Sequence, residues 1–267
     1  MVNVKGSTVV VTGGQRGLGK AIVAELLERG AAKVYASARA PKPSQDARVV
    51  SVELDVTEPG SVAALAARAA DADIVINNAG VLGARTLLDS DIEDVRAVFE
   101  TNYFGALRVA KAFAPILAAN GGGALVDIAS ILSWMPGSGG YGDSKAALWS
   151  TTNSLRIELE KQGTLVVAAH LSFTDTEMTS GFDAPKNDPR QVAPDRRRHR
   201  GGRCGGAGRR RHPLRQGGTV RTGRGAAADG VNRLDGGPPR LGPKSTTRDG
   251  ARRVWIATCP IRNWIAL

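Results

Sequence analysis

Cysteine is nearly absent from this 267-residue chain, and so are long apolar runs. Both cysteines, Cys204 and Cys259, lie beyond residue 190, which excludes a disulfide framework or a cysteine-based metal site from the first part of the chain. No run reaches the roughly 18 apolar residues of a membrane-spanning helix, which excludes such a helix of ordinary length. The segment Met1–Ser7 lacks the charged and apolar regions of a secretory signal, so we expect a cytoplasmic protein.

Acidic residues are scarce only in the C-terminal part. The whole chain has 36 Lys and Arg against 25 Asp and Glu, a formal net charge of +11. Residues 1–190 hold 18 basic and 21 acidic residues, a net of −3, whereas residues 191–267 hold 18 and 4, a net of +14. The basic character therefore belongs to the last 77 residues and says nothing about partners of the first part.

Short β-branched runs alternate with helical patterns over the first 170 residues. We predict strands at 8–12, 33–38, 49–54, 74–76, 124–129 and 164–170, and helices at 20–29, 58–70, 91–119 and 141–161. Alternation of this kind is typical of βαβ units and a parallel sheet covered on both faces. The right-handed crossover rule then favours a Rossmann-like α/β fold: a doubly wound parallel sheet in three α/β/α layers, forming a single domain over residues 1–190.

A glycine-rich turn, TGGQRGLG at residues 12–19, lies between the first strand and the first helix. Glycines let a backbone approach a pyrophosphate, and the helix N-terminus offers free N–H groups and a positive dipole end. The alternative is a tight structural turn. We predict that the cofactor contacts here come from Gly13, Arg16, Gly17, Leu18 and Gly19.

The end of the second strand carries no carboxylate. A site that prefers NAD usually has an acid there for the ribose hydroxyls, whereas this chain has Ser37-Ala38-Arg39. Arg39 and Arg16 match a 2′-phosphate, because guanidinium groups pair with phosphate oxygens. Either arginine alone is equally explained as a solvated surface residue. Together they favour NADP as the cofactor over NAD.

Two further strand ends carry candidate cofactor contacts. Asp55, followed by Val56, ends the third strand and either accepts from the adenine amino group or caps the next helix. The sequence NNAG ends the fourth strand, where small residues allow close approach to a flat ligand; an ordinary Asn-rich turn is the alternative. The candidates here are Asn78, Ala79 and Gly80.

The sequence YGDSK places Tyr141 and Lys145 four residues apart in a predicted helix. Side chains at that spacing share a face, and a nearby ammonium favours phenolate and lowers the pKa of a tyrosine. Such a tyrosine can exchange a proton with a hydroxyl or carbonyl group near neutral pH. In isolation the pair is commonly a solvated helix face, but the glycine-rich turn upstream and Ser130 favour a catalytic pair.

With TGGQRGLG, DVT at 55–57, NNAG, TNYFG at 101–105, DIAS at 127–130 and YGDSK in this order, residues 6–190 resemble the short-chain dehydrogenase/reductase family. The resemblance implies that Tyr141 is the general acid and base and that Ser130 hydrogen-bonds the substrate oxygen. It implies that Lys145 binds the nicotinamide ribose and lowers the pKa of Tyr141. It also implies that Asn102 holds a water in the proton relay and that Thr176 meets the nicotinamide carboxamide.

The chain also departs from the family pattern. Leu171 and Ser172 stand where many members have Pro-Gly, and the interval from Ser130 to Tyr141 is short, with Ser133 as the nearest alternative serine. Trp134–Pro136 either lines an apolar substrate pocket or packs in the ordinary way.

The resemblance implies an enzyme that interconverts a small-molecule alcohol with an aldehyde or ketone. It also implies a homodimer formed through the helices at 91–119 and 141–162. An inactive or truncated relative that only binds ligands is the alternative.

The composition changes after Asp183, and Pro194–Asp249 consists largely of arginine, glycine and proline without apolar periodicity. Such a segment is expected to be disordered and cationic. Read one nucleotide forward, the codons of this segment permit a strand and an amphipathic helix, elements that the family has after its sixth strand. We therefore predict a change of reading frame between residues 191 and 195, and a tail at 191–267 separate from the domain at 1–190.

An arginine-rich arm that binds nucleic acid through phosphates is the other interpretation of the tail. Its only aromatic residues, Trp255 and Trp264, lie beyond the arginine-rich stretch, so nucleic acid is not the expected partner. Without a seventh strand, the predicted strand at 164–170 is expected to be an uncovered apolar edge.

Overall fold

The computed structural model describes residues 2–83, 86–181, 183, 185–189 and 256–257. Contacts divide the chain into one unit formed by Met1–Arg197 with Arg253–Leu267 and another formed by Arg198–Arg252. All described residues belong to the first unit. The two cysteines, the predicted change of reading frame and the segment of the alternative nucleic-acid arm lie outside the described residues.

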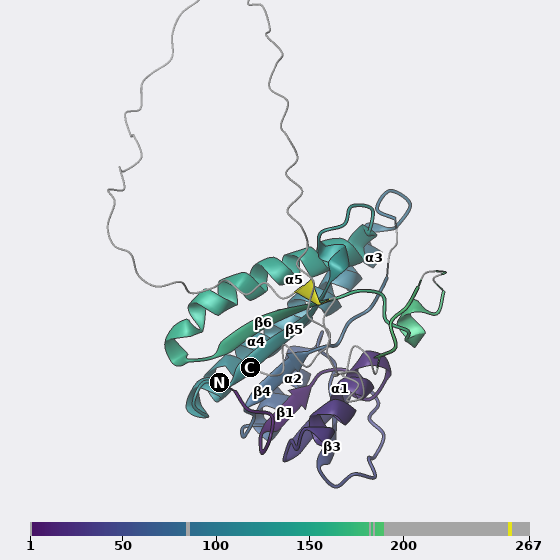
Figure 1. The fold of residues 1–267 in the computed structure, drawn as a ribbon. Helices are drawn as coiled ribbons and strands as arrows, with labels where there is room; N and C mark the ends of the chain where they lie inside the picture. Colours follow the sequence, from purple (N-terminus) through teal and green to yellow (C-terminus); the bar gives the residue numbers. More distant parts are fainter. Residues whose placement is uncertain (1, 84–85, 182, 184, 190–255, 258–267) are drawn as a thin grey trace, which may run out of the picture. The chain divides into compact units, whose positions relative to one another are not determined.

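The described strands form one parallel sheet with the order β3-β2-β1-β4-β5-β6-β7 (Figure 1). Their bounds are β1 Thr8–Val11, β2 Lys33–Ala38, β3 Val49–Glu53, β4 Ile74–Asn77, β5 Ala124–Ser130, β6 Leu165–Leu171 and β7 Ile256–Ala257. The chain builds outward from β1 to β3 and then returns to place β4 on the other side of β1. The predicted doubly wound sheet is confirmed, and its crevice for a ligand lies where the order reverses, at the carboxyl ends of β1 and β4.

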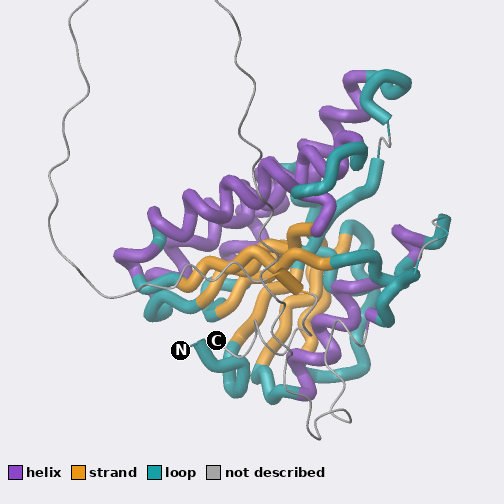
Figure 2. The backbone as a smooth tube through the Cα atoms, turned by 45° about the horizontal axis from the view of Figure 1, so that its top comes forward, coloured by secondary structure: helices purple, strands orange, loops and turns teal. Residues whose placement is uncertain are grey.

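Helices lie on both faces of the sheet (Figure 2). Their bounds are α1 Gly17–Glu28, α2 Pro59–Arg68, α3 Ile92–Phe99, α4 Ala106–Ala119 and α5 Gly139–Glu158. Short helical turns follow the ends of β5, α5 and β6: η2 Ile131–Ser133, η3 Glu160–Gln162 and η4 Glu177–Thr179. Among the described helices, none is long and apolar enough to span a membrane.

Alternate residues of the strands build two separate cores. On one face Val9 and Val11 of β1 pack in a cluster with Ile22 and Leu26 of α1. On the other face Val10 packs in a cluster with residues of α2 and α4. A central parallel strand needs apolar side chains on both faces, which explains why β1 is a continuous run of β-branched residues without alternation.

The edge beyond β6 differs from the prediction. The two-residue strand β7 pairs in parallel with the end of β6, His170 opposite Ile256 and Leu171 opposite Ala257. The expectation of an uncovered sixth strand is therefore wrong for His170 and Leu171. Sequence periodicity missed β7 because two residues are too short to show any period.

Candidate active site

A cavity of about 710 Å³ opens at the carboxyl ends of the strands. Its size suits a dinucleotide or a similarly large ligand. All but one of the predicted site residues line it: Gly13, Arg16, Gly17, Leu18, Gly19, Arg39, Asp55, Val56, Asn78, Ala79, Gly80, Ser130, Tyr141, Lys145 and Thr176. The exception, Asn102, lies behind the wall and contacts Val81, which does line the cavity.

Two glycines of the turn after β1 are required by its geometry. Gly13 has a φ of +64°, in the left-handed region that favours glycine. A Cβ atom on Gly19 would lie 2.1 Å from the Gly13 carbonyl oxygen, far inside van der Waals contact. The first turn of α1 therefore packs directly on the backbone of the glycine-rich turn, which leaves the N-terminus of α1 open to the cavity.

Thr12 ties the glycine-rich turn to the end of β4. Its Oγ1 accepts from the backbone N–H groups of Asn78 and Ala79, both at 2.9 Å. The Asn78 side chain donates back to the Thr12 carbonyl at 2.9 Å. Sequence reasoning missed this role of Thr12; a hydroxyl residue directly after a fully apolar strand is the signal that was available.

Asp55 forms a local turn beside Arg39. One carboxylate oxygen accepts from the Thr57 backbone N–H at 2.9 Å and from the Thr57 hydroxyl at 2.7 Å. These hydrogen bonds, with a smaller contribution from Arg39, lower the pKa of Asp55. The N-cap of α2 is Glu58, so the interpretation of Asp55 as the helix cap is wrong. The Asp55 carboxylate instead accepts from Thr57, which precedes the helix.

Ser130 and Tyr141 face each other across the cavity wall. Ser130 is the last residue of β5, and its Oγ accepts from the Leu132 N–H at 3.1 Å. Burial raises the pKa of Tyr141, and a hydrogen bond with the Ser130 side chain opposes that shift. Ser133 does not line the cavity within the described part of the chain, which favours Ser130 over it.

Lys145 is almost fully buried and binds the backbone rather than the phenol. Its Nζ donates to the Ile128 carbonyl at 2.8 Å and lies 5.8 Å from the centre of the Tyr141 ring. Burial lowers the pKa of Lys145 to about 8, while the charge of Asp127 opposes this. The net pKa of Tyr141 is raised, so the predicted lowering by Lys145 is wrong for this arrangement, because burial is the largest effect and only Ser130 opposes it.

The predicted helix at 91–119 is interrupted by a π-helical segment, η1 Glu100–Gly105, between α3 and α4. Asn102 lies in it, fully buried, and its amide pairs with both backbone groups of Val81: Oδ1 accepts from N–H at 2.8 Å and Nδ2 donates to the carbonyl at 2.9 Å. Nδ2 also donates to Ser144 Oγ at 3.1 Å. Local π-helical widening is frequent at functional sites, and here it joins α5 to the cavity wall.

His170 supports Ser130 and was missed by sequence reasoning. The fully buried His170 ring places Nδ1 3.1 Å from the Ser130 carbonyl oxygen. Trp134 stacks on it at 4.1 Å and Trp149 packs edge-on at 5.7 Å between ring centres. Burial lowers the pKa of His170, which favours the neutral ring that donates from Nδ1. Trp134 thus packs on His170, while the cavity-lining residues near it are Ile131 and Leu132.

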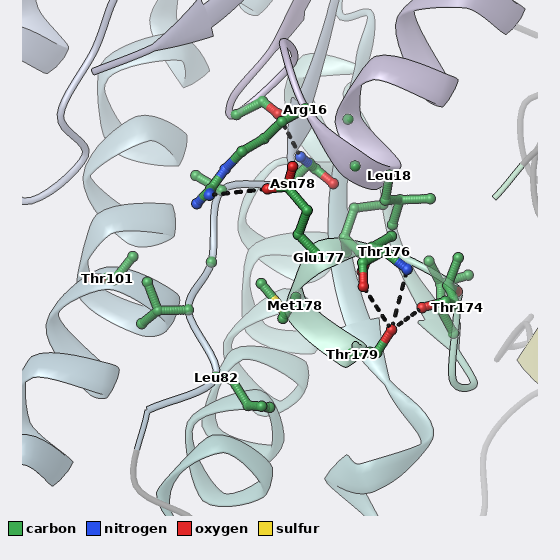
Figure 3. A pocket seen from close by; sticks show the side chains of 18 of the residues that line it. Arg16, Leu18, Asn78, Leu82, Thr101, Thr174, Thr176, Glu177, Met178 and Thr179 are labelled. Carbon is green, nitrogen blue, oxygen red and sulfur yellow. Dashed lines mark hydrogen bonds and ion pairs between the residues drawn. The ribbon is translucent and has the colours of Figure 1, made fainter. Parts of the chain in front are cut away.

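The segment after β6 crosses over the glycine-rich turn (Figure 3). The backbone of Asn187 makes two hydrogen bonds with this segment, both at 2.8 Å. Its N–H donates to the Phe173 carbonyl, and its carbonyl accepts from the Asp175 N–H. Thr176 caps η4, and its side chain lies beside Gly17. Glu177 approaches Arg16 at 3.9 Å, between two largely exposed side chains. Figure 3 shows this pair joined by a dashed line.

Residues 7–187 match a family model described as short chain dehydrogenase. The 1-deoxy-11-beta-hydroxypentalenate dehydrogenase of Streptomyces avermitilis is 36% identical over 198 residues, covering 68% of this chain and 73% of that protein. The 3-oxoacyl-(acyl-carrier-protein) reductase FabG of Escherichia coli is 31% identical over 191 residues, covering 67% and 78%. A crystal structure of a short chain dehydrogenase from Burkholderia cenocepacia in complex with NADP has a TM-score of 0.68 at 38% identity, covering 71% of this chain and 82% of that one.

Proposed function

This chain belongs to the short-chain dehydrogenase family and is an oxidoreductase, and we propose that it uses NADP in preference to NAD to interconvert an alcohol and a carbonyl. One observation carries the proposal: Ser130, Tyr141 and Lys145 line the same cavity as the glycine-rich turn. A nicotinamide bound there would supply or accept the hydride. Consumption of NADPH with a panel of apolar aldehydes and ketones tests it, and no consumption with any of them would favour the inactive relative.

Tyr141 is the proposed proton donor and acceptor for the substrate oxygen. Ser130 and Tyr141 line the same cavity, so a substrate oxygen bound there can meet both hydroxyl groups. Ser130 orients that oxygen, and Lys145 holds a positive charge under the site while donating to the Ile128 carbonyl. Asn102, held by Val81 and Ser144, is proposed to support the proton path from behind.

The substrate end of the cavity is apolar. The apolar residues Val81, Leu82, Ile131, Leu132 and Met178 line the cavity wall, and Glu177, next to Met178, is directed towards Arg16. We propose a small-molecule substrate whose body is apolar and whose reactive group is an alcohol, aldehyde or ketone. Apolar lining of this kind discriminates by shape and burial rather than by charge.

The preference for NADP rests on the cations at the other end of the cavity. Arg16 and Arg39 both line it, and β2 ends at Ala38 without a carboxylate. Asp55, the acid beside Arg39, is engaged by Thr57, and Glu177 approaches Arg16 only at 3.9 Å between exposed side chains. We propose that the two guanidinium groups bind the 2′-phosphate.

Replacement of Arg39 by Asp is expected to lower kcat/KM with NADPH by about 10- to 100-fold, because hydrogen bonds to charged groups contribute about 1.5–3 kcal/mol. With NADH the value should stay level or rise, because the new carboxylate can accept from ribose hydroxyls. Steady-state kinetics with both cofactors check this, with Arg39→Met as the neutral control. A wild-type enzyme that already prefers NADH contradicts the proposed cofactor.

The rate is expected to fall as the pH rises through about 8, the pKa to which burial lowers Lys145. Above that pH the ammonium loses its proton, and with it the positive charge under the site that is proposed to bind the ribose. Below it the charge is retained. A kcat profile between pH 6 and 10 checks the prediction, and Lys145→Met should lose this limb. A wild-type profile that stays level past pH 9 contradicts it.

We further propose a cytoplasmic homodimer that forms through 91–119 and 141–162. Phe104 and Ile157, in these two segments, are large apolar side chains that are 44% and 74% exposed, and a partner that covers them would remove apolar surface from water. Sedimentation equilibrium of the full chain should give twice the chain mass, and Ile157→Lys should shift the equilibrium towards monomer. A wild-type monomer at micromolar concentration contradicts the proposal.

A further inference from the structure

A side-chain amide joins the glycine-rich turn to the loop after β2. Gln15 Nε2 donates to the Lys42 carbonyl and to Ser51 Oγ, both at 2.9 Å, and Lys42 N–H donates to Gln15 Oε1 at 2.8 Å. Ser51, on β3, donates in turn to the Lys42 carbonyl at 2.7 Å. The Lys42 backbone is therefore held on both its N–H and its carbonyl, by residues from two different elements.

The chain on either side adds stiffness to this position. Pro41 and Pro43 flank Lys42, and each proline fixes its own φ and restricts the residue before it. Little backbone entropy is left at Lys42 to be lost when a ligand binds. Two hydrogen bonds to the Gln15 amide and two prolines are more than an ordinary surface loop receives, which indicates that the position of Lys42 matters.

The charges around the cavity show what this lysine is free to do. Lys42 lines the same cavity as Arg16 and Arg39, next to Gln15 in the glycine-rich turn. Arg16 approaches Glu177 at 3.9 Å, and Arg39 influences the charge on Asp55. Among the described residues, the exposed Lys42 ammonium makes no ion pair. Of the three cations only Arg16 has a carboxylate partner among the described residues, so Lys42 and Arg39 both keep their charge for a ligand.

We infer that Lys42 is a third phosphate-binding cation that discriminates NADP from NAD, and that Gln15 with Ser51 acts as its positioning pair. This rests on the proposed use of NADP. Lys42 serves as a point charge beside the two guanidinium groups, and its ammonium needs no fixed angle to a phosphate oxygen. Gln15 touches the lysine only through its backbone, so it acts on cofactor choice through Lys42.

The test compares kcat/KM for NADPH and NADH in the full chain. Lys42→Met is expected to lower the NADPH value by roughly three- to tenfold, as for an exposed cation facing a phosphate, and to leave NADH within twofold. Gln15→Leu and Ser51→Ala should lower the NADPH value in the same direction. Lys5→Met, which removes an equal charge from an exposed position before β1 that does not line the cavity, is the matched control and should change neither value.

The double variant separates positioning from general damage. If Gln15 acts through Lys42, then Lys42→Met with Gln15→Leu should lose no more than Lys42→Met alone, whereas independent effects add. Equal losses with both cofactors, or an unchanged ratio in Lys42→Met, would overturn the inference. Wild-type preference for NADH would instead overturn the proposed cofactor. The wild type therefore tests the cofactor, and the Lys42→Met variant tests the inference.

Discussion

Tyr141→Phe is expected to lower kcat for carbonyl reduction by about 10²- to 10⁴-fold, the usual contribution of a general acid. The change removes one hydroxyl group and leaves the ring in place beside Ser130. Binding of NADPH, followed by fluorescence titration, should stay within about twofold, because the hydroxyl faces the substrate oxygen in the proposed arrangement. Loss of rate without loss of cofactor binding would assign Tyr141 to the chemical step.

The chain offers a matched control in Tyr103. It lies in η1, its hydroxyl accepts from Thr151 at 3.4 Å, and it does not line the cavity. Tyr103→Phe removes the same atom from the same residue type and should leave kcat near the wild-type value. Equal rates in wild type and Tyr141→Phe would remove Tyr141 from the mechanism, whatever the control does.

Gly19→Ala is expected to destabilise the protein by about 3 kcal/mol or more and to abolish NADPH binding. Its new Cβ would lie 2.1 Å from a backbone oxygen and 2.6 Å from the Asn78 amide nitrogen, and overpacking against side chains alone already costs about 1–3 kcal/mol. To relieve the overlap, the N-terminus of α1 must move away from the turn that it closes. Urea unfolding and cofactor titration on the same preparation measure both effects.

Gly60→Ala is the control for this substitution. Gly60 is in the first turn of α2, as Gly19 is in the first turn of α1, but nothing lies within 4 Å of a Cβ atom there. Alanine should therefore stabilise the protein slightly, by about 0.5–1 kcal/mol, through its better helix propensity. If both variants unfold alike, the close approach at Gly19 is not what the fold depends on.

Substitutions in the proton-transfer part of the site and in its cofactor-binding part are expected to have different effects. Substitutions at Tyr141 act on the proton and leave the cofactor end intact, whereas those at Gly19, Arg39 or Lys42 act on the cofactor first. The cavity joins both ends through one continuous wall, so a defect at the cofactor end lowers the rate through binding. Separate measurement of cofactor affinity and kcat therefore distinguishes these classes of variant.

Some features of this protein were determined by the sequence alone. The alternation of apolar strands and helical patterns was enough to predict the parallel sheet, because period and length of each run are local properties. The glycine-rich turn, NNAG and YGDSK were likewise enough to identify the wall of the cavity. Each is a short contiguous motif at the carboxyl end of a strand or the start of a helix, and that edge is where such a fold brings its strand ends together.

Other features were decided only by the tertiary structure. The pKa of Tyr141 is raised by burial while Lys145 donates to the Ile128 carbonyl, and helical spacing contains no information about burial. The pairing of Gln15 with Lys42 and Ser51 joins positions 27 and 36 residues apart. His170 reaches Ser130 across 40 residues through strand register. Desolvation and long-range hydrogen bonds depend on where distant segments meet, which no local pattern records.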